Sequence, residues 1–126
     1  MREAVIVSTA RTPIGKAYRG SFNNTHAQTL AGHAISEAVK RAKVDPTDID
    51  DVILGAAAQQ GTQQGNIARQ SLLRAGLPKS VAGMSIDRQC ASGMMAIATA
   101  AKQIIDDGMN VTAVSYTHLR AHETAR

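Results

Sequence analysis

The sequence predicts an α/β protein in which a mainly parallel sheet is flanked by helices. Short apolar runs with the character of buried strands occur at residues 4–7, 52–54 and 81–86, and a fourth begins at residues 109–111. Segments with helical periodicity fill the intervals between these runs. Strands that alternate with helices are typical of parallel sheets, because each connection has to cross back over one face of the sheet.

The first strand is expected at residues 4–7, where apolar and largely β-branched residues follow one another without alternation. Such runs are typical of strands that are covered on both faces. A loop rich in turn-forming residues follows. Thr25 and Gln28 then have the spacing of a capping box, and apolar residues recur behind them at helical intervals up to Ala42.

The middle of the chain contains a second strand and a second helix. The pair Asp45-Pro46 starts a short turn of helix, and residues 52–54 form the strand. The polar stretch at residues 55–65 is expected to be a loop. Asn66 can cap the helix that follows, and Gly76 marks its end.

The third strand, residues 81–86, leads into a long helix that is expected from about Ala91 to Asp107, with Gly108 at its end. The helix carries a broad apolar face that should pack on the sheet. The face is formed by Met94, Ile97, Ala98, Ala101, Ile104 and Ile105.

The single cysteine, Cys90, lies where the third strand ends and the long helix begins. A helix N-terminus presents unpaired backbone N–H groups and the positive end of the helix dipole, and both favour a thiolate. Active residues of α/β folds also gather at the carboxyl ends of strands. Cys90 is therefore a candidate nucleophile, and its own backbone N–H is a candidate oxyanion donor.

The neighbours of Cys90 are those that an acyl-transfer site needs. Gly93 would let another backbone or a ligand approach the first helical turn, and Gln89 and Ser92 bring hydrogen-bonding side chains. The alternative is that Cys90 is a small packed hydrophobe, since cysteine is among the residue types most often buried. The chain would then be a non-catalytic α/β binding or interaction module.

Composition limits the other possibilities. With 126 residues, 44% of them hydrophobic, the chain has material for one domain. Its net charge of +4 forms no basic block, and two Tyr, one Phe and no Trp leave few groups that could stack on bases. The single cysteine fits a reducing compartment, and neither a secretory signal nor a membrane span is evident. We therefore expect a cytoplasmic or organelle-matrix protein that binds neither nucleic acid nor a membrane.

Histidines give no sign of a metal site. His118 and His122 are four residues apart, as two ligands on one helix face would be, but no third ligand is evident. His26 and His33 lie in the first helical segment and at its start, and we interpret them as surface or packing residues. No metal is therefore expected.

Two segments resemble the signature regions in the N-terminal half of thiolases, and the similarity covers about residues 1–112. The first segment reads Glu3-Ala4-Val5-Ile6-Val7-Ser8-Thr9-Ala10-Arg11-Thr12-Pro13-Ile14-Gly15-Lys16. The second reads Arg88-Gln89-Cys90-Ala91-Ser92-Gly93-Met94. The resemblance implies a partial thiolase-like layered fold, with residues 1–112 as an incomplete N-terminal domain.

The resemblance also implies an acyltransferase of fatty acid metabolism in which Cys90 becomes acylated. Such an enzyme cleaves 3-ketoacyl-CoA with coenzyme A or condenses two acetyl-CoA molecules, so coenzyme A and acyl-CoA are substrates and no cofactor is bound. Thiolases keep a catalytic histidine, a second cysteine and a further oxyanion donor in a C-terminal half that this chain lacks. The fragment is therefore expected to be inactive by itself, and the full-length parent to be a homodimer or homotetramer. The preferred acyl-chain length and the direction of the reaction stay open.

The end of the chain departs from the thiolase pattern. Where that family continues its strand into a glycine-rich turn, the run from Val114 to Thr124 resembles the translated adapter that ends some reading frames from shotgun assemblies. We therefore expect residues 113–126 to be a non-native tail, with a divergent natural terminus as the alternative.

Overall fold

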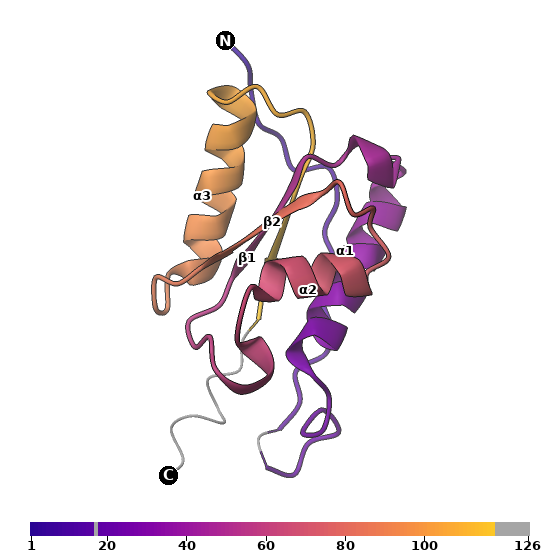
Figure 1. Ribbon diagram of the computed structural model, residues 1–126, viewed down its shortest axis with the longest axis vertical. Coiled ribbons are helices and arrows are strands. Elements are labelled where there is room, and N and C mark those ends of the chain that lie inside the picture. Colours follow the sequence, from indigo (N-terminus) through magenta and orange to yellow (C-terminus); the bar gives the residue numbers. More distant parts are fainter. Residues whose placement is uncertain (17, 118–126) are drawn as a thin grey trace.

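The computed structural model describes residues 1–16 and 18–117, and this part of the chain folds into three layers. Its elements in chain order are α1 (Ala27–Ala42), η1 (Pro46–Asp48), β1 (Asp51–Gly55), η2 (Gly61–Gln63), α2 (Ile67–Arg74), β2 (Ala82–Ile86), α3 (Ser92–Ile105) and β3 (Thr112–Tyr116). The strands are parallel and lie in the order β2-β1-β3. Helices α1 and α2 cover one face of the sheet and α3 covers the other (Figure 1). The predicted α/β class, with a parallel sheet between helices, is confirmed.

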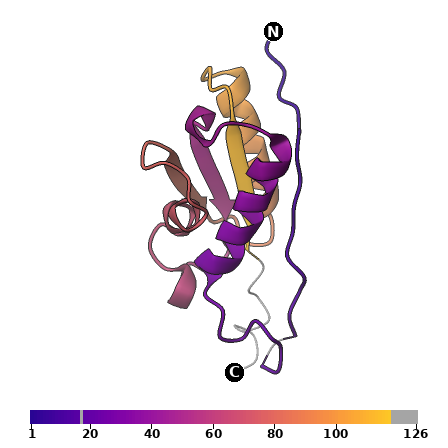
Figure 2. The same cartoon turned by 90° about the vertical axis from the view of Figure 1, so that its right-hand side faces the viewer.

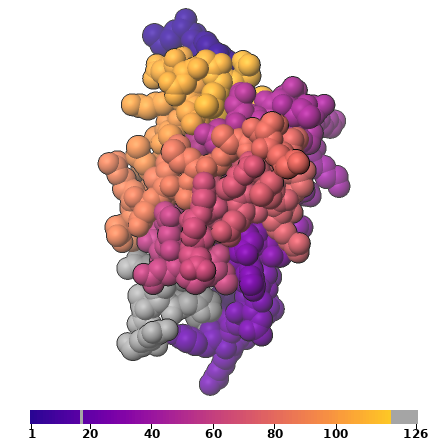
Figure 3. Space-filling model, in the orientation of Figure 1, coloured from indigo at the N-terminus to yellow at the C-terminus, as the bar shows by residue number. Residues whose placement is uncertain are grey.

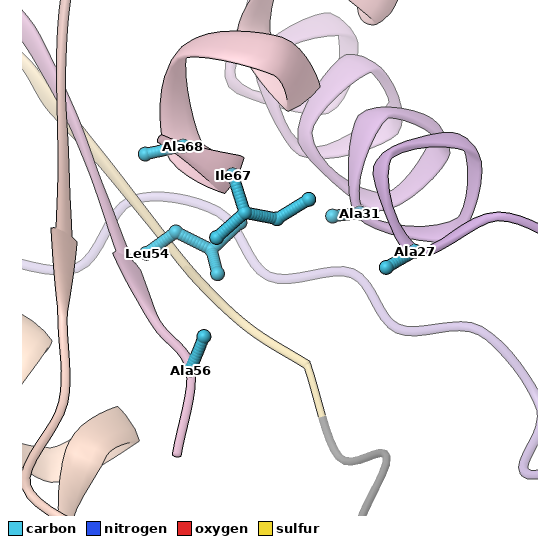
Figure 4. Packing of buried hydrophobic residues seen from close by; sticks show 6 residues of the cluster. All are labelled: Ala27, Ala31, Leu54, Ala56, Ile67 and Ala68. Carbon is cyan, nitrogen blue, oxygen red and sulfur yellow. The ribbon is translucent and has the colours of Figure 1, made fainter. Parts of the chain in front are cut away.

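Strand β1 is the centre of the sheet, and all of its residues are buried. Val52 and Leu54 pack against α1 and α2, whereas Ile53 packs against α3. Figure 4 shows Leu54 and Ile67 of α2 side by side, with the alanines of α1 next to them. Because both faces of β1 are covered, its sequence is apolar without alternation, and the strand predicted at residues 52–54 is confirmed.

Helix α1 is confirmed, but the capping box predicted for it is wrong. The N-cap is His26, and its side chain makes no capping hydrogen bond. The backbone N–H of Ala27 instead donates to Thr62 Oγ1 at 3.3 Å. The first turn of α1 therefore receives its acceptor from a distant loop, which local spacing cannot reveal.

Two other predicted helix starts are confirmed. Asp45 Oδ1 accepts hydrogen bonds from the backbone N–H of Thr47 at 2.9 Å and from its hydroxyl at 2.7 Å. These two bonds lower the pKa of Asp45, so the stability that they add is present above the ordinary pKa and is lost as pH falls through the lowered one. Asn66 caps α2 by accepting from the backbone N–H of Arg69 at 3.2 Å.

The strand expected at residues 4–7 is not formed. This segment belongs to no strand, and Val5, Ile6 and Val7 are 70%, 76% and 72% exposed. Strand β1 already has β2 on one edge and β3 on the other. The prediction is wrong: within the described residues the sheet ends at β2 and β3, and the segment pairs with the outer edge of neither. A β-branched run favours a strand but does not by itself secure a place in the sheet.

Side-chain hydrogen bonds hold the N-terminal segment against the body of the domain. Arg2 donates to the carbonyl oxygen of Met109 at 3.0 Å, and Ser8 Oγ donates to the carbonyl oxygen of Ala38 in α1 at 2.7 Å. Figure 2 shows the segment running beside α1, and Figure 3 shows the first residues against the chain that follows α3. The segment therefore packs as an extended strap outside the sheet.

Helix α3 places its small residues, and not its large apolar ones, on the sheet. Ala96 and Ala100 are buried against Ile53, whereas Met94 and Ile97 are 76% and 51% exposed. The prediction that this apolar face packs on the sheet is therefore wrong. The segment is helical as predicted, but its buried side carries Ala96 and Ala100 together with Gln103, whose Nε2 donates to Asp51 Oδ2 at 2.8 Å.

The last two elements differ slightly from the predicted bounds. Helix α3 runs over Ser92–Ile105 and stops before the expected Asp107, although Gly108 does adopt a positive φ of 80° beyond it. Strand β3 begins at Thr112, after the run at residues 109–111 that was expected to start it.

We expect the 126-residue chain by itself to be insoluble or molten. Large apolar side chains are exposed on the N-terminal segment and on α3, and contiguous surfaces of this kind favour aggregation. They are Val5, Ile6, Val7, Ile14, Met94 and Ile97. Solubility, binding of a dye that reports exposed apolar surface, and thermal unfolding measure this; a soluble monomer with a sharp two-state melt would contradict it.

Candidate functional site

Cys90 lies at the carboxyl edge of the sheet, in the connection from β2 to α3. The register pairs Gly55 with Ile86 and with Tyr116, so the three strands end at one edge. Cys90 follows Ile86 by four residues and precedes the first residue of α3, Ser92, by two. Its connection is at the lower left in Figure 1. The junction of strand and helix predicted from the sequence is therefore present.

Cys90 is exposed at the tip of a tight turn formed by residues 88–92. The backbone N–H of Ala91 donates to the carbonyl oxygen of Arg88 at 3.0 Å, and that of Ser92 donates to the carbonyl oxygen of Gln89 at 3.1 Å. Gln89 adopts a left-handed backbone with φ 50°. The thiol is therefore presented at the surface of the described chain and is not a packed core residue.

The Ser92 side chain bridges the backbone of this turn by hydrogen bonds. Ser92 is 0% exposed, its Oγ donates to the carbonyl oxygen of Gln89 at 2.7 Å, and it accepts from the backbone N–H of Arg88 at 2.8 Å. From the other side, Asp87 Oδ1 accepts from the backbone N–H of Gln89 at 2.9 Å. Hydrogen bonds on both sides of Cys90 thus fix the backbone that carries it.

Two glycines allow the start of α3 to approach the sheet. A Cβ atom on Gly55 would lie 2.6 Å from the carbonyl carbon and oxygen of Ser92, far inside van der Waals contact. A Cβ atom on Gly93 would lie 3.1 Å from Cγ of Tyr116. The close approach expected at Gly93 is therefore made by a side chain of β3. Gly55 was missed, although a glycine that ends a fully buried strand often marks such an approach.

The histidines do not join this site. His26 is the N-cap of α1 and His33 lies within α1; both are exposed, on a helix that covers the opposite face of the sheet from α3. His118 and His122 lie outside the described residues. Within residues 1–16 and 18–117, no group of three or more His, Cys, Asp or Glu residues could hold a metal ion.

Among the helices of residues 1–16 and 18–117, none combines the length and the hydropathy that crossing a bilayer requires.

The fold and the turn define an α/β domain that presents a single cysteine at the carboxyl edge of a parallel sheet. The family model described as the N-terminal domain of thiolase matches residues 4–115. The chain therefore belongs to the thiolase family.

Individual relatives agree with this assignment. A 3-ketoacyl-CoA thiolase of Saccharophagus degradans is 44% identical over 82% of this chain and 27% of its own length. A 3-oxoadipyl-CoA/3-oxo-5,6-dehydrosuberyl-CoA thiolase of Escherichia coli is 46% identical over 82% of this chain and 26% of its own. The chain thus spans about a quarter of the length of these relatives.

A solved structure is similar over almost the whole chain. The crystal structure of the Bacillus anthracis acetyl-CoA acetyltransferase matches with a TM-score of 0.87 and 39% identity, and the match covers 97% of this chain and 30% of that one. That acetyltransferase can also supply, for experiments, the part of the relatives' length that this chain does not span. We call "joined protein" a chain in which residues 1–112 of this sequence replace the matching N-terminal segment of that acetyltransferase.

The left-handed backbone at residue 89 predicts which substitutions the turn accepts. In the joined protein, Gln89→Gly should leave the free energy of unfolding within about 1 kcal/mol, because relief of strain offsets the entropy of glycine. Gln89→Ile should cost about 1–3 kcal/mol, since a β-branched residue tolerates φ 50° poorly. Urea unfolding midpoints measure both, and equal midpoints for glycine and isoleucine would show that the backbone at residue 89 is not constrained.

Proposed function

We propose that the whole protein represented by this chain is a thiolase-type acyltransferase in which Cys90 carries the acyl group as a thioester. The observation that carries the proposal is the exposed thiol at the tip of the 88–92 turn, immediately before α3. The hydrogen-bonded turn fixes the backbone that carries this thiol, as positioning of a nucleophile requires. Membership of the thiolase family supports the same reaction class.

In the degradative direction, Cys90 Sγ attacks the 3-keto carbonyl carbon of a 3-ketoacyl-CoA. The bond between C2 and C3 breaks, and the acetyl-CoA fragment leaves as an enolate that takes up a proton. The thiol of coenzyme A then attacks the thioester, so that acyl-CoA leaves and Cys90 is restored. The backbone N–H of Cys90 would donate to the oxyanion in both steps.

In the synthetic direction, Cys90 takes the acetyl group of one acetyl-CoA and releases coenzyme A. A second acetyl-CoA then loses a proton from C2, and this carbon attacks the acetyl carbon of the thioester. The bond between that carbon and Cys90 Sγ breaks, so that acetoacetyl-CoA leaves and the Cys90 thiol is restored by taking up a proton. Both directions need a base, which relatives would carry in the part of their length that this chain does not span. Coenzyme A and acyl-CoA are therefore proposed as substrates, with no bound cofactor.

The proposal also covers the cellular compartment and the oligomeric state of the whole protein. The relatives named 3-ketoacyl-CoA thiolase support a role in fatty acid metabolism, which fits a cytoplasmic or organelle-matrix enzyme. The exposed apolar side chains of α3 are of the kind that a homodimer or homotetramer, or the remainder of a longer chain, would cover.

We also propose that residues 113–126 are not native to the protein. The support for this proposal is the run from Val114 to Thr124, which resembles a translated adapter. The family match continues to residue 115, and β3 extends over Thr112–Tyr116, so the first residues of the proposed tail pair with β1. Sequencing the source DNA across codons 109–116 tests the proposal. A reading frame that continues differently after residue 112 supports it, and an unchanged frame in the genome contradicts it.

Formation of the acyl-enzyme tests the catalytic proposal. The joined protein is incubated with acetyl-CoA, digested with trypsin and examined by mass spectrometry. Cleavage after Arg88 and after Lys102 releases residues 89–102, which contain the single cysteine of this chain. We expect one acetyl group on this peptide, and none after Cys90 has been blocked with iodoacetamide.

The same experiment separates the alternative. A joined protein that is folded by circular dichroism but acquires no acetyl group at Cys90 would contradict the acyltransferase proposal. Slow alkylation of its Cys90 would then favour a non-catalytic binding module.

A further inference from the structure

We infer that Ser92 is a positioning residue for the acylation step: its buried hydroxyl holds the backbone turn that aims the Cys90 thiol. The inference rests on the proposed function, in which Cys90 is the nucleophile. Ser92 does not touch the reacting atoms itself. It acts through the two residues that precede Cys90, Arg88 and Gln89.

The hydrogen bonds of Ser92 cross the turn on which Cys90 sits. Its Oγ donates to the carbonyl oxygen of Gln89 and accepts from the backbone N–H of Arg88, at 2.7 and 2.8 Å. One hydroxyl therefore satisfies a donor and an acceptor on adjacent residues. Loss of the hydroxyl would leave both without this partner at the point where the chain turns into Cys90.

Burial makes this clamp hard to replace. Ser92 is 0% exposed, so bulk water does not reach the position of its hydroxyl in this structure. Gln89 holds a left-handed backbone with φ 50°, a conformation that glutamine does not favour. The surrounding contacts must therefore maintain it, and the side chains of Ser92 and Asp87 each hold Gln89 through a hydrogen bond to its backbone.

The position of Ser92 is itself fixed by the sheet. Its carbonyl group lies so close to Gly55 that a Cβ on Gly55 would be 2.6 Å away. Strand β1, to which Gly55 belongs, is fully buried. Ser92 thus connects the fully buried central strand to the turn that carries the nucleophile, and such support from a packed element is what pre-organisation of a reacting group requires.

A second buried serine provides a matched control. Ser71 in α2 is also 0% exposed, but its Oγ has no hydrogen-bond partner among the described residues. Ser71→Ala makes the same chemical change as Ser92→Ala at the same degree of burial. Only the change at residue 92 removes hydrogen bonds to the turn.

The test compares Ser92→Ala, Ser92→Thr and Ser71→Ala in the joined protein. Misplacement of a reacting group by about 1 Å can cost about a hundredfold in rate, so Ser92→Ala should lower kcat and single-turnover acylation by about tenfold to a hundredfold. KM for acyl-CoA should stay within about twofold, because Ser92 does not contact substrate. Threonine keeps the hydroxyl and should restore most of the rate, and Ser71→Ala should match the unsubstituted protein.

A folded Ser92→Ala variant with unchanged kcat would overturn the inference, as would a change confined to KM. If Ser92→Ala does not fold, the threonine variant provides the test. A folded Ser92→Thr with near-normal kcat supports the hydroxyl clamp. A folded Ser92→Thr whose kcat falls by about the tenfold to hundredfold expected for alanine contradicts it. Alkylation of Cys90 by iodoacetamide keeps the two proposals apart. If the folded joined protein forms no acyl-enzyme, the proposed function fails. Slower alkylation of Cys90 in Ser92→Ala than in Ser71→Ala would still support the clamp, and equal alkylation rates would overturn the clamp.

Discussion

Substitution of Cys90 by alanine should lower kcat of the joined protein by at least about a thousandfold, since loss of a covalent nucleophile removes the whole acyl-enzyme route. Stability should change little, because the Cys90 side chain is exposed and surface substitutions usually shift the free energy of unfolding by about 0.5 kcal/mol or less. The measurement is thiolytic cleavage of acetoacetyl-CoA together with the urea unfolding midpoint.

The variant Cys90→Ser is the conservative companion to this experiment. It keeps the size and the turn but replaces the sulfur nucleophile with a much weaker hydroxyl, so its kcat should fall almost as far as that of Cys90→Ala. Retention of more than about a tenth of the original kcat by the alanine variant would mean that Cys90 does not carry the acyl group. An inactive variant with a normal unfolding midpoint locates the loss in chemistry and not in folding.

Residues 4–7 and β1 show how far an apolar pattern determines a strand. Both are short, β-branched and without alternation, and only β1 lies in the sheet. The difference lies in pairing: β1 has a strand on each edge, whereas residues 4–7 pair with neither of the outer strands, β2 and β3. Periodicity reports that a segment is suited to a sheet, but which segments occupy the available edges is a property of the whole chain.

Helix α3 differs from its prediction in the face that is buried. The helical period was visible in the sequence, and so was the position of Cys90 before its first turn. The buried side was not, because Ala96 and Ala100 carry little hydrophobic signal compared with Met94 and Ile97. Small side chains are selected by the distance between helix and sheet, which the sequence of the helix does not state.

The candidate site itself was predictable only as a location. A cysteine between a strand and a helix follows from local pattern, and the structure places Cys90 at that junction, exposed at the edge of the sheet. The hydrogen bonds of the Ser92 hydroxyl are local, but the place of Ser92 against the sheet depends on the space left by Gly55, about forty residues earlier in the chain. That contact forms only when the chain is folded, and the rotamer that turns the Ser92 hydroxyl back onto Arg88 and Gln89 does not follow from the residue type.

A methyl group at Gly55 should have the largest structural effect of any single substitution near the site. The Cβ of Gly55→Ala would be 2.6 Å from the carbonyl carbon and oxygen of Ser92, and these are backbone atoms that no rotamer change can move. The start of α3 must therefore shift away from β1. Overpacking of this kind costs about 1–3 kcal/mol in free energy of unfolding, and the displaced Cys90 should lose about a hundredfold in kcat.

Gly32→Ala provides the graded control for this prediction. Its Cβ would lie 3.1 Å from Cβ and Cγ of Arg74 and from the carbonyl oxygen of Ser71, so the contact is less severe and falls partly on a long side chain. Gly32 is also inside α1, where alanine is favoured over glycine by about 1 kcal/mol. We expect Gly32→Ala to keep the unfolding midpoint and the kcat of the unsubstituted joined protein, whereas both should fall in Gly55→Ala. If Gly55→Ala keeps its unfolding midpoint and kcat as Gly32→Ala does, the close contact between β1 and α3 does not position Cys90.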